Sequence, residues 1–330
     1  MTARSGERRR ESGNSTAVRP QPPGLSLPAL SCRFAGAVKG QAIVLLVLLL
    51  MSFSIPAPAA GAGSDSLPLR LPESGIGYEG TKDTRPAGLH LDEAYLKGYL
   101  ADAGKMVNSP RYWDAGDWSA AALMLSLSAG LYAYDQDLKE WFQERRSGTT
   151  DDLAGVFGPF GNPFVILPAL GFAYYYGETQ GSEKAKRIGL LGAESVIIAG
   201  AFTGLIKFAG HRHRPDKGDG YDRWDGPGFS TANLSFPSEH ASAAFSLATV
   251  IAAESENVYV APAAYGIASL VAFSRLNDNE HWSSDAFLGA ALGYFTGRAV
   301  LRLHAKKDRQ LMLLPQVTGE RYGLMMSFGF

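Results

Sequence analysis

The chain has 330 residues, a formal net charge of −1 and a hydrophobic content of 46%. This length suits one large domain or two small ones, and the near-neutral charge gives no indication of a nucleic-acid partner. The single cysteine, Cys32, precedes the apolar segment described next. The chain after that segment therefore contains no thiol, which excludes disulfides, thiolate–metal binding and thiol catalysis there.

The N-terminal region is organised like an export signal. Residues 1–41 are polar and basic, residues 42–55 are apolar, and the small residues PAPAAGAG follow. An apolar run of about 14 residues is short for a helix that crosses a bilayer, and the small residues offer a cleavage site after Ala59 or Ala62. We expect residues 1–59 to be a leader and cleaved signal peptide, with an uncleaved anchor as the alternative.

Residues 60–117 are predicted to be a linker and an amphipathic helix. The stretch 60–90 is rich in Gly, Pro and Ser and has little periodicity, which is typical of a linker. Residues 91–107 have apolar side chains at helical spacing. Asp92 and Glu93 lie in the first turn, where the helix dipole favours acidic groups.

The core of the chain, residues 118–305, is predicted to be an all-α bundle of about six helices. The apolar segments that predict them cover about 118–135, 153–176, 184–210, 239–254, 257–273 and 283–303. Gly and Ala are frequent in them and allow helices to approach closely. In the tail, residues 306–330, two apolar runs flank Thr318-Gly319-Glu320-Arg321, which predicts a short β-hairpin.

The residues that can carry chemistry lie in three short segments at the ends of the predicted helices. The segments run from Lys207 to Pro215, from Pro237 to His240, and from Ser274 to Asp285. Their fixed-spacing positions supply three cations, two histidines and one carboxylate. This set is what phosphoryl transfer through a histidine requires, because cations neutralise the phosphoryl oxygens while one imidazole attacks and the other protonates the leaving oxygen.

The spacing K-x6-R-P, then P-S-x-H, then S-R-x5-H-x3-D resembles the type 2 phosphatidic acid phosphatase (PAP2) and vanadium haloperoxidase superfamily. The resemblance implies a PAP2-like helical domain with its site at one end of the bundle. Glu239 departs from the pattern, because it stands where the family usually has glycine. An inward-pointing Glu239 would repel phosphate, whereas an outward-pointing one leaves its N–H available. We expect retained activity, with an inactive relative as the alternative.

The resemblance also implies roles for individual residues. His281 is expected to be the nucleophile that forms a phosphohistidine, with Asp285 orienting it, since residues four apart share one helix face. His240 is the expected general acid. The structural alternative for all three is ordinary capping or packing at helix ends.

The expected phosphate-binding groups surround these residues. Arg214 and Arg275 can each form bidentate bonds with phosphate, Lys207 provides a point charge, and Ser238 offers its hydroxyl or its N–H. The main-chain N–H of Glu239 completes the set. His211 and His213 have no clear carboxylate partner in the sequence, so we predict no metal site and no cofactor. We expect residues 216–225 to be a solvated loop beside the site.

The resulting function is a metal-independent phosphatase of phosphomonoesters, or of lipid phosphates and diphosphates, on the extracytoplasmic side. The partner is a phosphate ester or lipid phosphate, with membrane association also expected. The alternatives are a vanadate-dependent haloperoxidase and a non-catalytic envelope protein that binds phosphate or lipid. Because export of residue 60 followed by three crossings would leave Lys207 in the cytoplasm, we favour a bundle that does not span the membrane. The protein is then periplasmic or membrane-associated; an integral inner-membrane protein with its site facing the periplasm is the alternative.

Overall fold

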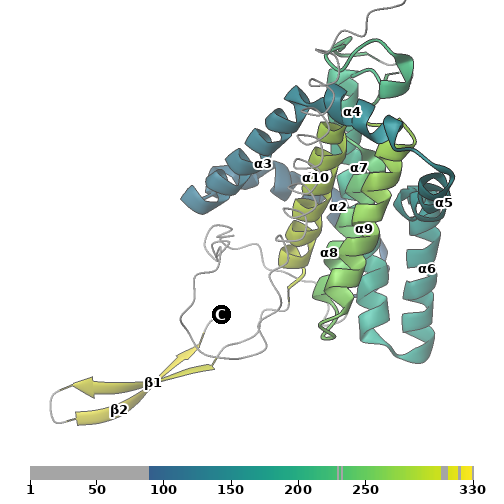
Figure 1. Cartoon of the computed structure of the whole chain (residues 1–330). Helices are drawn as coiled ribbons and strands as arrows, with labels where there is room; N and C mark the ends of the chain where they lie inside the picture. Colours follow the sequence, from purple (N-terminus) through teal and green to yellow (C-terminus); the bar gives the residue numbers. More distant parts are fainter. Residues whose placement is uncertain (1–88, 229, 232, 306–310, 319–320, 329–330) are drawn as a thin grey trace, which may run out of the picture.

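The computed structural model describes residues 89–228, 230–231, 233–305, 311–318 and 321–328. The predicted signal peptide and most of the predicted linker lie outside these residues. The described chain from 89 to 305 is helical (Figure 1), as the sequence predicts. Its α-helices are α2 (Glu93–Asn108), α3 (Ala115–Ala133), α4 (Asp135–Glu144), α5 (Gly148–Phe157), α6 (Pro163–Gln180), α7 (Glu183–Gly210), α8 (Glu239–Ala253), α9 (Val260–Asn277) and α10 (Ser283–Leu303). Short 3-10 helices are η1 (Ser109–Tyr112), η2 (Gly158–Gly161) and η3 (Pro215–Lys217).

Most helices begin at a short polar side chain. Asp92 accepts a hydrogen bond from the N–H of Tyr95 at the start of α2. Ser182 and Ser238 do the same for α7 and α8. These caps satisfy backbone donors that have no partner in the first turn, and they explain why the boundaries predicted from apolar spacing lie within a few residues of the observed ones.

Two segments differ from the prediction. The apolar stretch 153–176 is interrupted by η2, and the helices on either side of the break are bent by 57°. Pro159 and Pro163 account for this break, because each removes a backbone donor and restricts the preceding residue. The polar helix α4 was not predicted, because its residues DQDLKEWFQE contain few apolar side chains.

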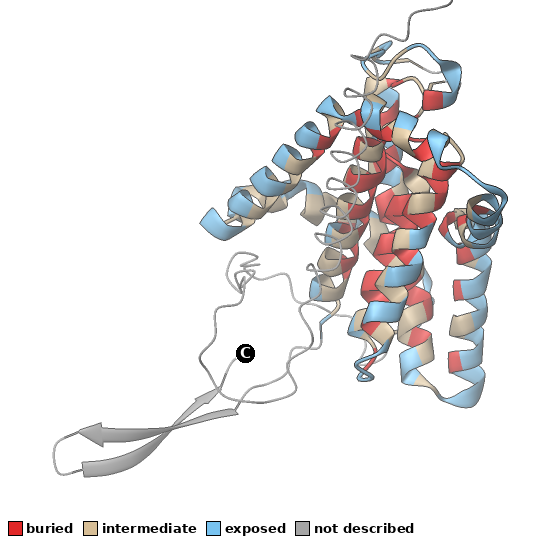
Figure 2. Ribbon diagram, in the orientation of Figure 1, coloured by how far each residue is buried: buried red, intermediate tan, exposed pale blue. Residues whose placement is uncertain are grey.

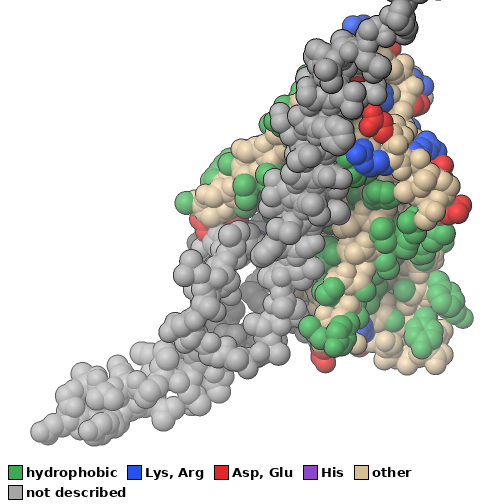
Figure 3. Space-filling model, viewed as in Figure 1, with side chains coloured by type: hydrophobic (Ala, Val, Ile, Leu, Met, Phe, Trp, Pro, Cys, Tyr) green, Lys and Arg blue, Asp and Glu red, His purple; other side chains and the backbone are tan. Residues whose placement is uncertain are grey.

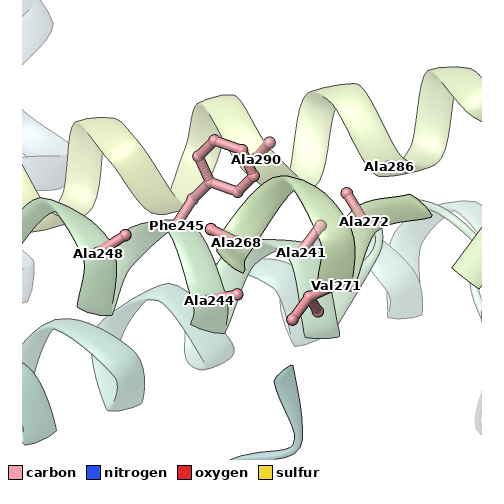
Figure 4. Close-up of a cluster of buried hydrophobic side chains, with 9 residues drawn as sticks. All are labelled: Ala241, Ala244, Phe245, Ala248, Ala268, Val271, Ala272, Ala286 and Ala290. Carbon is pink, nitrogen blue, oxygen red and sulfur yellow. The ribbon is translucent and has the colours of Figure 1, made fainter. Parts of the chain in front are cut away.

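The core lies where α8 packs against α9 and α10, and buried positions concentrate on these helices (Figure 2). Phe245 is the large side chain of the central cluster, and most of the other members are alanines (Figure 4). The complete cluster is Ala241, Ala244, Phe245, Ala248, Ala268, Val271, Ala272, Ala286 and Ala290. Small side chains at these positions let the three backbones lie close together.

A stripe of glycines on α10 faces α8. A methyl group at Gly289, Gly293 or Gly297 would overlap the carbonyl oxygen of Ser238, Ser242 or Ser246, in that order. We expect Gly293→Ala to lower the free energy of unfolding by about 1–3 kcal/mol, because the helices must separate to admit the methyl group. Denaturant titration measures this change. Gly266→Ala on α9, where no atom lies within 4 Å of the added methyl group, is the control, and its helix propensity should leave stability equal or slightly higher. Equal effects of the two substitutions would contradict the packing argument.

The C-terminal part of the described chain forms two strands, β1 (Leu311–Thr318) and β2 (Arg321–Phe328). They pair antiparallel, with Leu311 opposite Phe328. Residues 306–310 and 319–320, which connect these strands to the bundle and to each other, lie outside the described part. The C-terminal hairpin therefore stays a prediction.

One described helix, Glu183–Gly210, is long and apolar enough to cross a membrane, and 56% of its apolar window is buried inside the bundle. The bent pair Gly148–Gly161 and Pro163–Gln180 passes the same test when its two helices are taken together. A buried core helix has the same length and composition as a membrane span, so these segments leave the predicted non-spanning arrangement as a prediction.

Candidate active site

The three sequence motifs meet at one end of the bundle, near α4 (Figure 1). Lys207 lies in the last turn of α7, and Ser238 caps the start of α8. Arg275 lies in the last turn of α9, and His281 and Asp285 flank the start of α10. Helix termini therefore bring together residues that are up to 78 positions apart, between Lys207 and Asp285.

His281 and Asp285 are both buried. Nδ1 of His281 lies 3.8 Å from Oδ2 of Asp285, which is an electrostatic contact rather than a hydrogen bond. Nδ1 has no hydrogen-bond partner among the described residues. Burial lowers the pKa of His281, although Asp285 opposes the shift. The imidazole is therefore neutral near pH 7, with one ring nitrogen unprotonated.

Asp285 is held in place by several donors. Its Oδ2 accepts hydrogen bonds from the Ser235 hydroxyl and, at 3.0 Å, from the N–H of Trp282. Burial favours the protonated carboxyl, but His281 and Arg212 together hold the pKa of Asp285 below its ordinary value. The carboxylate thus stays charged beside the imidazole that it faces.

Arg212 was not predicted as a site residue, yet it forms ion pairs with two buried carboxylates, one of which lies beside His281. Its fully buried guanidinium contacts Asp285 at 2.5 Å and Asp135 at 2.8 Å. Asp135, the first residue of α4, also accepts hydrogen bonds from the backbone and hydroxyl of Ser284. Within the sequence, Arg212 is one of several basic residues in HRHRP, and Asp135 belongs to the helix that apolar spacing does not reveal. No local sequence pattern therefore indicates the ion pair between Arg212 and Asp135.

The three predicted phosphate-binding cations are present, and each has a protein partner. Lys207 is buried and donates to the Leu234 carbonyl oxygen, and burial lowers its pKa to about 8. Arg214 donates to Oε2 of Glu280 at 2.8 Å. Arg275 donates to Oδ2 of Asp278, also at 2.8 Å. We call Lys207, Arg214 and Arg275 the clamp.

Ser238 has only one group left for a phosphate. Its N–H donates to the Asp285 carbonyl oxygen at 2.9 Å, so this donor is already used. Its hydroxyl oxygen accepts from the N–H of Ala241 at 3.4 Å, which leaves the hydroxyl proton available. Glu239 is half-buried at the first position of α8. Its charge raises the pKa of Lys207, against the larger effect of burial.

His240 is half-buried at the second position of α8 and lines a cleft of about 540 Å³. Burial first, and then the charge of Arg275, lower its pKa to about 4. The cleft walls come from α5, η2, α6 and the end of α9, and are formed by Arg146, Asp151, Ala154, Gly155, Gly158, Pro159, Asn162, Val165, Arg275 and Asp278. Of the predicted site residues in the described part of the chain, His240 and Arg275 line this cleft.

The loop after α7 corrects one detail of the sequence interpretation. His213 does have carboxylate partners, because Nδ1 lies 2.6 Å from Asp219 and Nε2 lies 2.9 Å from Asp225. Although partial burial opposes it, these two carboxylates raise the pKa of His213. The imidazole of His213 therefore joins two positions of the acidic loop.

Residues with metal-ligand chemistry also gather away from this site. Asp102, Glu194 and His304 are buried, and Nε2 of His304 lies 3.3 Å from Asp102 and 3.0 Å from Glu194. The two carboxylates raise the pKa of His304 despite its burial. The carboxylates therefore favour the protonated form of His304, and Lys105 adds a further ion pair with Asp102 at 2.8 Å.

The comparisons with known proteins agree with the geometry. Residues 189–309, which include all three motifs, match the PAP2 superfamily. A lipid A 1-phosphatase from Porphyromonas gingivalis is 33% identical over 107 residues, which are 32% of this chain and 21% of that relative. The chain thus spans about a fifth of the length of this curated relative.

Two solved structures are also similar. LpxE from Aquifex aeolicus has 23% identity and a TM-score of 0.41, covering 51% of this chain and 94% of that one. A transmembrane PAP2 type phosphatidylglycerolphosphate phosphatase from Bacillus subtilis has 17% identity and a TM-score of 0.41, with 66% and 98% covered. The match to the PAP2 superfamily covers residues 189–309, the part of the chain that contains the motifs from which the sequence predicts this resemblance.

Proposed function

We propose that the protein is a metal-independent phosphatase that transfers the phosphoryl group of a lipid phosphate or other phosphate ester to His281 and then to water. The observation that carries the proposal is the buried His281 beside Asp285, with the clamp cations converging on the same end of the bundle. A neutral imidazole next to a carboxylate is an activated nucleophile, and the clamp supplies charge stabilisation for the phosphoryl oxygens.

The roles follow from position and charge. The unprotonated nitrogen of His281 attacks phosphorus while the bond to the leaving oxygen breaks. Asp285 stabilises the positive charge that develops on the imidazole, and Arg212 keeps Asp285 charged and in place. His240 protonates the leaving oxygen and then takes a proton from the water that hydrolyses the phosphohistidine.

His240 must be protonated to act as an acid, although the protein lowers its pKa to about 4. The cations Arg275 and Lys207 disfavour a further positive charge there. A bound phosphate dianion offsets these charges. Substrate binding therefore raises the pKa of His240 toward the range in which it can deliver a proton.

A lipid phosphate is the substrate class that the available observations favour. The P. gingivalis relative is named as a lipid A 1-phosphatase. Large apolar side chains along α6 are exposed, with Phe164 at 89%, Phe172 at 69% and Tyr175 at 64%. Figure 3 shows hydrophobic side chains gathered on the side of the bundle where α6 lies. Such a surface supports membrane association, and the predicted export signal supports an extracytoplasmic location.

A non-catalytic phosphate-binding protein is the second candidate, and Glu239 favours it. A carboxylate at the first position of α8 weakens the attraction of the clamp for a second anion.

The test of the proposal is phosphate release by the full chain from p-nitrophenyl phosphate and from phosphatidic acid in mixed micelles, with EDTA present. Release that persists in EDTA supports the phosphatase. Binding of inorganic phosphate without release from either substrate would favour the binding protein, and activity recovered by Glu239→Gly would identify Glu239 as the cause.

Deprotonation of Lys207 is expected to set the alkaline limit of activity. Its pKa is about 8 because burial disfavours the ammonium ion, so the cation is present below that pH and is lost above it. We expect kcat/KM to fall as pH rises through about 8. Lys207→Arg keeps the charge at high pH and should move this fall to higher pH. An unchanged alkaline limit in Lys207→Arg would show that another group sets it.

A further inference from the structure

Glu280, the residue before His281, lies between the two arginines of the clamp. Its Oε2 accepts a hydrogen bond from Arg214 at 2.8 Å and lies 3.9 Å from Nη1 of Arg275. One carboxylate oxygen thus faces two guanidinium groups that belong to different motifs. A phosphoryl group bound by the clamp would need the same donors.

We propose that Glu280 is the resident anion of the clamp, which holds Arg214 and Arg275 together before substrate binds and is displaced by the phosphoryl group of the substrate. The proposal rests on the proposed function for the identity of the displacing ligand. Two guanidinium groups that approach each other repel, and a shared carboxylate removes this repulsion. The Glu280 carboxylate therefore competes with phosphate for these two guanidinium groups.

The geometry allows the Glu280 side chain to leave without moving the backbone. Its N–H donates to the Arg275 carbonyl oxygen at 3.0 Å, so the main chain stays fixed beside His281. Its side chain is 41% exposed, so the released carboxylate is solvated. Asp278 differs, because it contacts Arg275 from one helical turn away and no ion pair joins it to Arg214 among the described residues.

Glu280 makes no bond to the reacting atoms and acts as a positioning residue, so its removal should change affinity more than turnover. Glu280→Gln keeps the shape and removes the charge. We expect the Kd for inorganic phosphate and the KM for p-nitrophenyl phosphate to fall roughly fivefold, as for loss of partly exposed ion pairs. The value of kcat should change less than about twofold, because binding that is equal in ground and transition states does not alter it.

The experiment is calorimetric titration of the full chain with inorganic phosphate, together with steady-state kinetics on p-nitrophenyl phosphate. Glu254→Gln is the matched control, because Glu254 pairs with Arg187 at 2.7 Å outside the three motifs and should leave phosphate affinity unchanged. Glu280→Asp keeps the charge and should retain affinity close to that of the unaltered chain, which separates charge from shape.

Tighter phosphate binding by Glu280→Gln alone supports the proposal. Unchanged or weaker binding by Glu280→Gln, or equal effects of Glu280→Asp and Glu280→Gln, overturns it. The titration needs no turnover, so a chain that binds phosphate but releases none from esters would defeat the proposed function and leave this inference standing. Absence of phosphate binding by both the unaltered chain and Glu280→Gln would overturn the inference.

Discussion

Replacement of His281 by alanine is expected to reduce kcat for phosphate release roughly 10⁴-fold or more, because it removes the proposed nucleophile beside Asp285. Folding should change little beyond the cost of a small cavity. The measurement is kcat for p-nitrophenyl phosphate, alongside a thermal unfolding curve that confirms the fold.

His213→Ala is the matched control for the His281 substitution. His213 also faces carboxylates, but they belong to the loop after α7 rather than to the start of α10. Its loss should leave more than about a tenth of the activity, since it orders a loop without touching phosphate. Comparable losses in the two variants would mean that His281 acts through structure rather than as the nucleophile.

Arg212→Met is expected to have the largest effect on stability, lowering the free energy of unfolding by about 3–5 kcal/mol near pH 8. The substitution leaves Asp135 and Asp285 buried without their shared cation. Burial already raises the pKa of Asp135 to about 6 even with Arg212 present. Because Asp135 becomes neutral as pH falls, the loss should be smaller at about pH 5 than at about pH 8. Denaturant titrations at both pH values measure the difference.

Two further variants test the origin of this loss. Arg146→Met removes an arginine whose ion pair with Asp151 is exposed at 40% and 44%, so it should cost no more than about 1 kcal/mol. Adding Asp135→Asn to Arg212→Met removes one unpaired charge and should recover part of the stability. If Arg212→Met costs no more than Arg146→Met, the buried ion pairs do not hold the site together.

Most of the helical core could be predicted from apolar spacing and end signals. The segments predicted at 184–210, 239–254 and 283–303 agree closely with α7, α8 and α10, because Ser182 and Ser238 cap the first two and Asp285 closes the first turn of the third. The prediction was wrong where prolines or buried polar contacts, rather than apolar spacing, determine the helix boundaries. Prolines divide the segment 153–176, and α4 is held by Leu138, Phe142 and the Asp135 network rather than by a long apolar stripe.

The grouping of the motif residues at one end of the bundle could be predicted, but the contacts between them could not. Fixed spacing in the motifs located the histidines and the clamp. The partner of Asp285, the carboxylate between Arg214 and Arg275, and the use of the Ser238 N–H by a backbone carbonyl all depend on where separate helices end. Such contacts join residues far apart in the chain, and no local pattern records them. The roles assigned to the motif residues remain proposals.

A phosphohistidine at residue 281 is the central claim, and its direct detection is the most direct test. The full chain is mixed with radiolabelled p-nitrophenyl phosphate, quenched in alkali and digested, and the labelled peptide is identified by mass spectrometry. The His240→Ala variant should accumulate the intermediate, because p-nitrophenolate leaves without an acid while hydrolysis loses its base. Label on His281 that is absent from His281→Ala is the predicted result. Steady phosphate release with no label on His281 in either the unaltered chain or His240→Ala would contradict the account.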